Sequence, residues 1–422
     1  MSSLDTTVCD YVVKSSPTIA ELILEESQRQ SENIELIASE NYPSDAVRAT
    51  MASCLTNKYA EGYPELDRHS GRQGRYYGGC QTVDKLEEYC CDKWREVFET
   101  DYHVNVQPHS GTQANLSAYC AVLEPGDTVL AMSLENGSHL SHCGPASISG
   151  KIYNRVEYGV DENGFIDYED LEKKLRYYHP KMVLAGASAY SRIIDFKRIK
   201  NIIDAVQLEE LVERKNNYRP YFMVDIAHIA GLIAAGHHPS PFGLADIITT
   251  TTHKTLRGPR GGLIFCKPGL AKKVDGAVFP TNQGGPLMHI IAGKAVCAEE
   301  ALTQEFKQYI FQVLYNTWIM CNEFKAMGYK VITDGTDNHL FLIDLTKNFP
   351  NLTGREVQEE LDKHKITLNK NCVPNEKRSP MEASGLRIGC AAMTTKGWNA
   401  IQFIAVAHSI DKIIRELDQR KI

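Results

Sequence analysis

The feature that most limits the fold of this chain is an alternation of short apolar runs with amphipathic stretches through its middle third. Runs at 127–133, 182–186 and 221–225 have the length and composition of strands, whereas 170–178 and 195–206 have helical periodicity. Such alternation is typical of a largely parallel sheet covered by helices, in which ligands bind at the carboxyl ends of the strands. The sequence therefore predicts an α/β fold with functional residues placed directly after strands.

One candidate of this kind is Lys254, in the stretch T-T-T-T-H-K-T-L-R-G-P-R-G-G at 249–262. A β-prone run at 244–248 leads into it, so the lysine is expected just beyond a strand. Threonine hydroxyls, that of Thr251 among them, surround it, and the glycines that follow permit a sharp turn or a close approach. A lysine in this setting is a candidate Schiff-base amine, although a solvated surface lysine is the commoner meaning of such a pattern taken alone.

Three further features could complete a ligand site at the same edge of the sheet. Ser110, Gly111 and Thr112 follow an apolar run and open a helix, where free N–H groups favour a phosphate, although such residues usually serve only as caps. Asp225 ends an apolar strand, and Arg387 interrupts another, where the alternative is a surface ion pair. The absence of a GK[ST] sequence argues against a P-loop NTPase.

Composition and charge exclude several classes of protein. A net charge of −7 and a pI near 6.1 give no nucleic-acid footprint, and no apolar run is long enough to span a membrane. The first residues lack the features of a secretory signal, and twelve cysteines without a CxxC pair indicate a reducing compartment, so a cytoplasmic location is expected. His139, His142 and Cys143 have no second cluster at a zinc spacing, so no metal is expected, and a histidine ring stacked on a flat ligand is the better interpretation.

One cofactor requires the four features together. Pyridoxal phosphate (PLP) needs an amine, a carboxylate that keeps its pyridine nitrogen protonated, and a phosphate cradle at a helix start. An amino-acid substrate adds a carboxylate, which an arginine binds with two hydrogen bonds. Lys254, Asp225, the Ser110–Thr112 helix start and Arg387 supply this set, and together they predict a PLP site.

Ten short blocks, in order along almost the whole chain, resemble the serine hydroxymethyltransferase family. They are L-I-A-S-E-N-Y (36–42), N-K-Y-A-E-G-Y-P (57–64), R-Y-Y-G-G (75–79), H-S-G-T-Q-A-N (109–115), G-S-H-L-S-H (137–142), S-A-Y-S-R (188–192), V-D-I-A-H-I-A-G-L (224–232), the threonine-rich stretch at 249–262, N-Q-G-G-P-L-M-H (282–289) and G-L-R-I-G (385–389).

The resemblance implies a fold-type I, aspartate aminotransferase-like enzyme with a mostly parallel sheet in a large domain and a smaller C-terminal α/β domain. The implied activity is that of a glycine hydroxymethyltransferase, a transferase of one-carbon metabolism and amino-acid biosynthesis. Such an enzyme reversibly transfers the hydroxymethyl group of L-serine to tetrahydrofolate, giving glycine and 5,10-methylenetetrahydrofolate, through PLP aldimine and quinonoid intermediates. Retro-aldol cleavage and direct displacement by folate both stay open. We expect a helical arm at 1–55, the large PLP-binding domain at 56–294 and the small domain at 295–422.

Residue roles follow from the matched blocks. For the cofactor, the resemblance implies Lys254 as the aldimine lysine, Asp225 at the pyridine nitrogen, His139 and Ala227 on the two ring faces, Ser188 and His228 near the ring hydroxyl, and Ser110, Gly111, Thr112, Gly284 and Gly285, with Gln283, at the phosphate. For the substrates it implies Ser39 and Arg387 at the serine carboxylate, and Leu134 and Leu140 in the folate pocket. In a homodimer or a dimer of dimers, Tyr59, Glu61 and Tyr77 would reach into the neighbouring subunit's site.

Proton transfer is assigned to a smaller group. Glu61 is the best candidate to move protons at the serine hydroxyl and the folate amine, and a solvated loop carboxylate is its alternative reading. Lys254, His228, Tyr59 and Thr251 complete the expected catalytic set.

The sequence departs from the family pattern at three places. The span between Gly62 and Arg75, just before Tyr77, is several residues longer than usual, which a surface loop tolerates. Cys143 stands where the family usually has glycine, and Cys390–Ala391 replaces its common Thr-Pro close to Arg387.

Two other functions remain open. A folate-independent PLP aldolase or racemase would share the PLP site, and Glu61 with the Leu134 and Leu140 blocks argues against it. A non-catalytic protein could retain the fold, but the intact Lys254, Asp225 and Arg387 argue against that.

Overall fold

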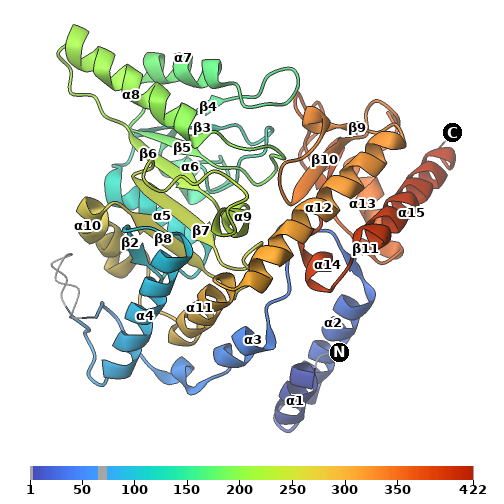
Figure 1. Ribbon diagram of the computed structural model, residues 1–422, viewed down its shortest axis with the longest axis horizontal. Helices are drawn as coiled ribbons and strands as arrows, with labels where there is room; N and C mark the ends of the chain where they lie inside the picture. Colours follow the sequence, from blue (N-terminus) through green and yellow to red (C-terminus); the bar gives the residue numbers. More distant parts are fainter. Residues whose placement is uncertain (1–2, 65–73, 422) are drawn as a thin grey trace.

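The centre of the molecule is a seven-stranded sheet in the order β2–β8–β7–β6–β5–β3–β4 (Figure 1). The structure is a computed structural model, and it describes residues 3–64 and 74–421. From β4 to β7 neighbouring strands are parallel, whereas β8 is antiparallel to both β7 and β2. The strands are β2 (His103–Asn105), β3 (Thr128–Met132), β4 (Asn154–Tyr158), β5 (Met182–Ala185), β6 (Tyr221–Asp225), β7 (Ile247–Thr251) and β8 (Gly262–Cys266). The predicted α/β fold with a mostly parallel sheet is confirmed.

Strands β3, β5 and β8 are almost wholly apolar because both faces of the sheet are buried. In β3, Leu130 and Met132 face one core while Val129 and Ala131 face the other, and β5 alternates in the same way. Helices that contribute to the first core are α4 (Gln81–Val97), α7 (Tyr168–Tyr178), α8 (Phe196–Glu213), α9 (Ala230–Ala234) and α11 (Met288–Ala301). The second core is covered by α5 (Gly111–Val122) and α10 (Ala271–Gly276), with α6 (Ile148–Ile152) beside it.

A second, four-stranded sheet forms the C-terminal part, in the order β12–β13–β10–β9. Its strands are β9 (Lys330–Val331), β10 (Leu340–Asp344), β12 (Asn369–Asn371) and β13 (Gly385–Gly389), and its helices are α12 (Gln304–Ala326), α13 (Gly354–Lys363), α14 (Ala391–Thr395) and α15 (Ala400–Gln419). A capping box of Thr353 and Glu356, with both reciprocal hydrogen bonds, opens α13. Long helix α12 contributes to two cores, with Phe306 in the first and Phe324 in the C-terminal one.

The N-terminal segment joins the two parts. Helices α1 (Ser3–Val12) and α2 (Pro17–Glu32) project from the body below the C-terminal helices (Figure 1). Strand β1 (Ile34–Glu35) then pairs in parallel with β11 (Ile366–Thr367), and α3 (Asp45–Met51) packs on α11. Across residues 3–64 and 74–421, no helix has both the length and the apolar character needed to cross a membrane.

Candidate functional site

Lys254 lies three residues beyond the end of β7, as predicted, and it is buried, with only 8% of its surface exposed. Its Nζ donates to Thr251 Oγ1 at 3.1 Å, and its backbone carbonyl accepts from Asn41 Nδ2 at 2.8 Å. Burial lowers the pKa of the ammonium group to about 8, and the charges of Arg387 and Arg260 act in the same direction. A buried amine with a lowered pKa is a nucleophile close to neutral pH, which a solvated surface lysine is not.

Asp225 ends β6 on the neighbouring strand, and three donors hold its carboxylate. One oxygen accepts from Asn115 Nδ2 at 2.8 Å and is 2.9 Å from His142 Nε2, while the other accepts from the Ala227 N–H at 2.9 Å. Burial alone would raise the pKa of this carboxyl, but the hydrogen bonds from His142 and Asn115 hold it well below its usual range. The result is a fixed negative charge inside the site.

The start of α5 is the segment where a phosphate cradle was expected. Ser110 is the N-cap, and its Oγ accepts from the Gln113 N–H at 3.2 Å. A methyl group on Gly111 would lie 2.6 Å from the Thr251 methyl, so only glycine allows the helix start to approach the Lys254 loop this closely. Gln283 braces the loop before the cradle, because its side chain accepts from the His109 N–H and donates to the Gln107 carbonyl, both at 3.0 Å.

A cavity of about 320 Å³ connects these groups. The predicted residues that line it are Ser39, Ser110, Gly111, Thr112, His139, Ser188, Asp225, Ala227, His228, Thr251 and Lys254. An amine, a fixed carboxylate and a helix N-terminus thus face one space of a size for a small aromatic ligand. These residues fit PLP, since each supplies an interaction that a different part of that cofactor requires.

Two histidines in the cavity are held as neutral rings. His139 Nδ1 is 2.6 Å from Ser141 Oγ, and His228 Nδ1 is 3.2 Å from His339 Nε2. Burial lowers the pKa of His139 to about 4 and holds the pKa of His228 well below its usual value. Neutral rings suit the roles expected of them, stacking on a ligand and hydrogen bonding to it.

Arg387 reaches the same edge from the second sheet. In β13, its Nη1 donates to the Ser188 carbonyl at 2.9 Å and its Nη2 to Asn369 Oδ1 at 2.7 Å. Its Nε is buried and has no hydrogen-bond partner among the described residues. Ser39 is brought close because a methyl group on Gly389 would lie 2.4 Å from the Ala38 Cα, so the segment before Ser39 packs directly on this strand. A half-buried cation whose buried Nε donor is free is suited to a substrate carboxylate.

A second group of predicted residues lies together but does not line the cavity. A methyl group on Gly284 would be 3.3 Å from Glu61 Oε1, and one on Gly285 would be 3.1 Å from the Tyr59 ring. The rings of Tyr59 and Tyr77 are 4.8 Å apart, and Tyr59 is 55% exposed. Among the described residues that line the Lys254 cavity, none belongs to this group.

Leu134 and Leu140, the residues expected at the folate, meet around Gly144. A methyl group on this glycine would lie 3.3 Å from Leu134 Cδ1 and 2.7 Å from the Leu140 carbonyl oxygen. The Leu140 side chain is 56% exposed. The Leu134 side chain and the Leu140 backbone therefore both lie beside Gly144, and Leu140 is exposed.

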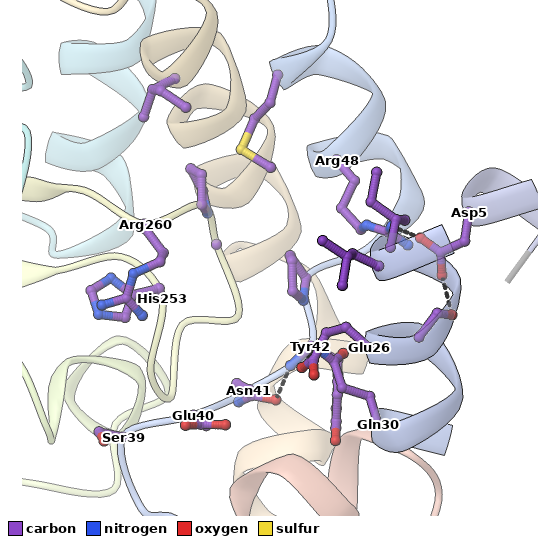
Figure 2. Close-up of a pocket in the computed structure, with 18 of the residues that line it drawn as sticks. Asp5, Glu26, Gln30, Ser39, Glu40, Asn41, Tyr42, Arg48, His253 and Arg260 are labelled. Atoms are coloured by element: carbon purple, nitrogen blue, oxygen red, sulfur yellow. Dashed lines mark hydrogen bonds and ion pairs between the residues drawn. The ribbon is translucent and has the colours of Figure 1, made fainter. Parts of the chain in front are cut away.

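A larger hollow of about 910 Å³ adjoins the cavity, and the two share Ser39, Glu40, His253 and Arg260. Figure 2 shows His253 and Arg260 on one side of it and Tyr42 with Glu26 of α2 on the other. The hollow and the Lys254 cavity therefore lie side by side.

The departures from the family pattern have different structural settings. Cys143 is buried and has a φ of +58°, a left-handed conformation that glycine adopts with less strain. Cys390 and Ala391 are buried where β13 ends and α14 begins. Most of the lengthened span between Gly62 and Arg75 lies outside the described residues.

Two residues to which sequence reasoning gave no role at the cofactor prove central to the site. Asn115 and His142 both bind Asp225, and Asn115 also accepts from Thr249 Oγ1 at 2.6 Å. A signal was available for Asn115, since it lies four residues after Gly111, on the same face of α5 as the cradle.

A family model described as "Serine hydroxymethyltransferase" matches residues 12–410 of the 422-residue chain. This match covers the cradle, Asp225, Lys254 and Arg387, and the fold is that of the fold-type I PLP enzymes to which the family belongs. The chain belongs to the serine hydroxymethyltransferase family and is a PLP-dependent glycine hydroxymethyltransferase.

Proposed function

We propose that this enzyme transfers the hydroxymethyl group of L-serine to tetrahydrofolate and releases glycine and 5,10-methylenetetrahydrofolate. The observation that carries the proposal is the burial of Lys254 in one cavity with Asp225 and the start of α5, with Arg387 reaching the same edge. PLP, when bound, supplies an electron sink for the breaking of the serine Cα–Cβ bond. Folate-independent aldol cleavage is the alternative, and no observation favours it.

For the cofactor, we assign the groups that surround the cavity. Lys254 holds the cofactor aldehyde, and Thr251 Oγ1, the acceptor at 3.1 Å, fixes the position of its amine. Asp225 accepts the N–H of the pyridine ring, and its low pKa keeps that proton on the ring. His139 and Ala227 lie against the two ring faces, with Ser188 and His228 near the ring hydroxyl.

The phosphate is assigned to the start of α5, where Ser110, Gly111 and Thr112 provide N–H and hydroxyl donors. Arg387 and Ser39 are assigned to the serine carboxylate. Leu134 and the exposed Leu140 are assigned to the folate ring system, because a flat heterocycle needs apolar contacts.

We further propose a cytoplasmic homodimer whose sites are shared between subunits. Support comes from the separation of Tyr59, Glu61 and Tyr77 from the Lys254 cavity of their own chain, and from the wide hollow that opens beside that cavity. In this arrangement Glu61 moves protons at the serine hydroxyl and the folate amine of the neighbouring subunit's site, and Gly284 and Gly285 approach that site's phosphate. We propose 1–55 as the arm, 56–294 as the large domain and 295–422 as the small one.

The function is tested with purified protein, PLP, serine and tetrahydrofolate, by measuring glycine and methylenetetrahydrofolate. Folate-dependent cleavage of serine, absent in a Lys254→Ala variant, is expected. Glycine formed from allo-threonine but never from serine and folate would contradict the proposal. Protein that takes up no PLP, with no absorbance band of a lysine-bound cofactor, would point to a non-catalytic protein.

Shared sites are tested by mixing two inactive variants, Lys254→Ala and Glu61→Gln. Random exchange makes half of the dimers hybrids with one intact site of two, so about a quarter of the wild-type activity should return. If the mixture stays inactive although subunit exchange is demonstrated, Glu61 acts within its own chain.

A further inference from the structure

Lys294, in the middle of α11, is a buried cation that the proposed chemistry does not use. Its side chain is 1% exposed, and all three N–H groups of the ammonium donate to backbone carbonyls. The acceptors are Val106 at 2.7 Å, Pro108 at 3.0 Å and Gly262 at 2.9 Å. Three carbonyl oxygens from two separate segments therefore converge on one ammonium group.

These carbonyls belong to the two loops that build the cofactor site. Val106 and Pro108 precede the cradle at Ser110, and Gly262 ends the loop that begins at Lys254. The loops also touch directly, because the Gly262 N–H donates to the Pro108 carbonyl at 3.0 Å and a methyl group on Gly262 would lie 2.4 Å from the Ser110 carbonyl oxygen. The ammonium thus lies where the phosphate loop crosses the lysine loop.

The fit around Lys294 is close. A methyl group on Gly261 would lie 2.4 Å from the Lys294 Cε, so the neighbouring loop leaves no space for a displaced side chain. Burial lowers the pKa of the Lys294 ammonium to about 8, but three carbonyl acceptors oppose its deprotonation because a neutral amine has only two N–H donors. A methionine of similar length would leave all three carbonyls without this donor.

We propose that Lys294 is a positioning residue for the phosphate of PLP. Its ammonium group fixes the Val106–Pro108 segment against Gly262, and thereby sets the N–H groups at the start of α5 at the distance from Lys254 that the cofactor requires. The inference rests on the proposed assignment of the α5 start to the phosphate. It predicts that Lys294 acts on the phosphate end of the ligand alone, since the aldehyde end is held by Lys254 itself.

The test compares two ligands that differ only in the phosphate. PLP and pyridoxal are titrated against wild-type protein, Lys294→Met and the surface control Lys307→Met, and imine formation is followed by absorbance. The affinity of Lys294→Met for PLP should fall by about tenfold or more while its affinity for pyridoxal changes by less than about twofold. The Lys307→Met variant should match the wild type for both ligands.

Equal losses for PLP and pyridoxal would overturn the inference, because they would show a general structural role, and so would unchanged PLP affinity. If wild-type protein binds no PLP, the proposed function fails together with the inference, whereas the other outcomes leave that function standing. Should Lys294→Met not fold, Gly261→Ala takes its place, since the added methyl displaces the ammonium but keeps its charge. The same selective loss for PLP is then expected, and equal losses again overturn the inference.

Discussion

Replacement of Arg75 by methionine is expected to remove the support of the segment that carries Glu61. The Arg75 side chain is 3% exposed and pairs with Asp84 at 2.8 Å and with the buried Glu87 at 2.6 Å. Its Nη1 also donates to the carbonyls of Ala60 and Gly62, both at 2.8 Å, on either side of Glu61. One guanidinium thus ties the Glu61 segment to α4.

The magnitude follows from the burial of the pair. Removing one partner of a buried ion pair costs about 3–5 kcal/mol, because the other charge is left unpaired. With an unfolding entropy of about 2.1 cal/mol/K per residue, a chain of 422 residues has about 0.9 kcal/mol/K in total, so the Tm should fall by about 3–6 °C. The rate of serine cleavage should fall as well, because the backbone on both sides of Glu61 loses its hydrogen bonds to Arg75.

Differential scanning calorimetry measures the effect, with Arg29→Met as a matched control. Arg29 forms an exposed pair with Glu26, a type worth less than about 1 kcal/mol, so its loss should move the Tm by about 1 °C at most. The double variant Arg75→Met/Glu87→Gln should regain part of the loss, because no buried charge is left unpaired. If Arg75→Met costs no more than Arg29→Met, or the double variant regains nothing, the buried-pair reasoning is wrong.

Three further outcomes are expected. Lys254→Ala should abolish turnover in the folate-dependent assay, and undiminished transfer would refute its role. Arg387→Lys should raise the KM for serine by about 30–100-fold, since a two-point contact with the carboxylate becomes a single one; an unchanged KM would place that carboxylate elsewhere. Asn115→Leu should lessen the lowering of the Asp225 pKa. Ionised Asp225 stabilises the fold above its unfolded pKa of about 3.9, and this stabilisation is lost as the pH falls towards the lower folded pKa. The free energy of unfolding should therefore decline less between pH 5 and 2 in the variant than in the wild type. Equal declines would show that the hydrogen bond from Asn115 does not lower the Asp225 pKa.

The parts of the site that could be predicted are those whose signal is local in sequence. Asp225 and Lys254 follow apolar strands, and Ser110 precedes a helix, so strand and helix patterns alone place them at one edge. The hydrogen bonds that hold the Asp225 carboxylate could not be predicted in this way. They come from Asn115 and His142, which are 110 and 83 residues away, and their contacts depend on how helix and loop pack.

The ends of some helices also depend on tertiary packing, which the hydrophobic periodicity of the sequence does not show. The helix expected at 195–206 continues as α8 to Glu213, and in this added part the buried Glu210 makes a 2.9 Å contact with His179. From the hydrophobic pattern alone, a glutamate at position 210 suggests a solvent-exposed segment beyond the end of the helix. Lys294 is a similar case, since a lysine within the apolar sequence of α11 gives no hint that backbone carbonyls will surround it.

Helix α12 has a consequence for how the chain can be divided. Its first half places Phe306, Ile310 and Val313 in the core beside the large sheet, and its second half places Met320 and Phe324 in the C-terminal core. Any cut within the helix exposes apolar surface on both pieces, and a cut before it leaves the first half without its partners. The two cores are therefore thermodynamically coupled through α12. Unfolding of either core by heat or denaturant removes packing contacts from the other.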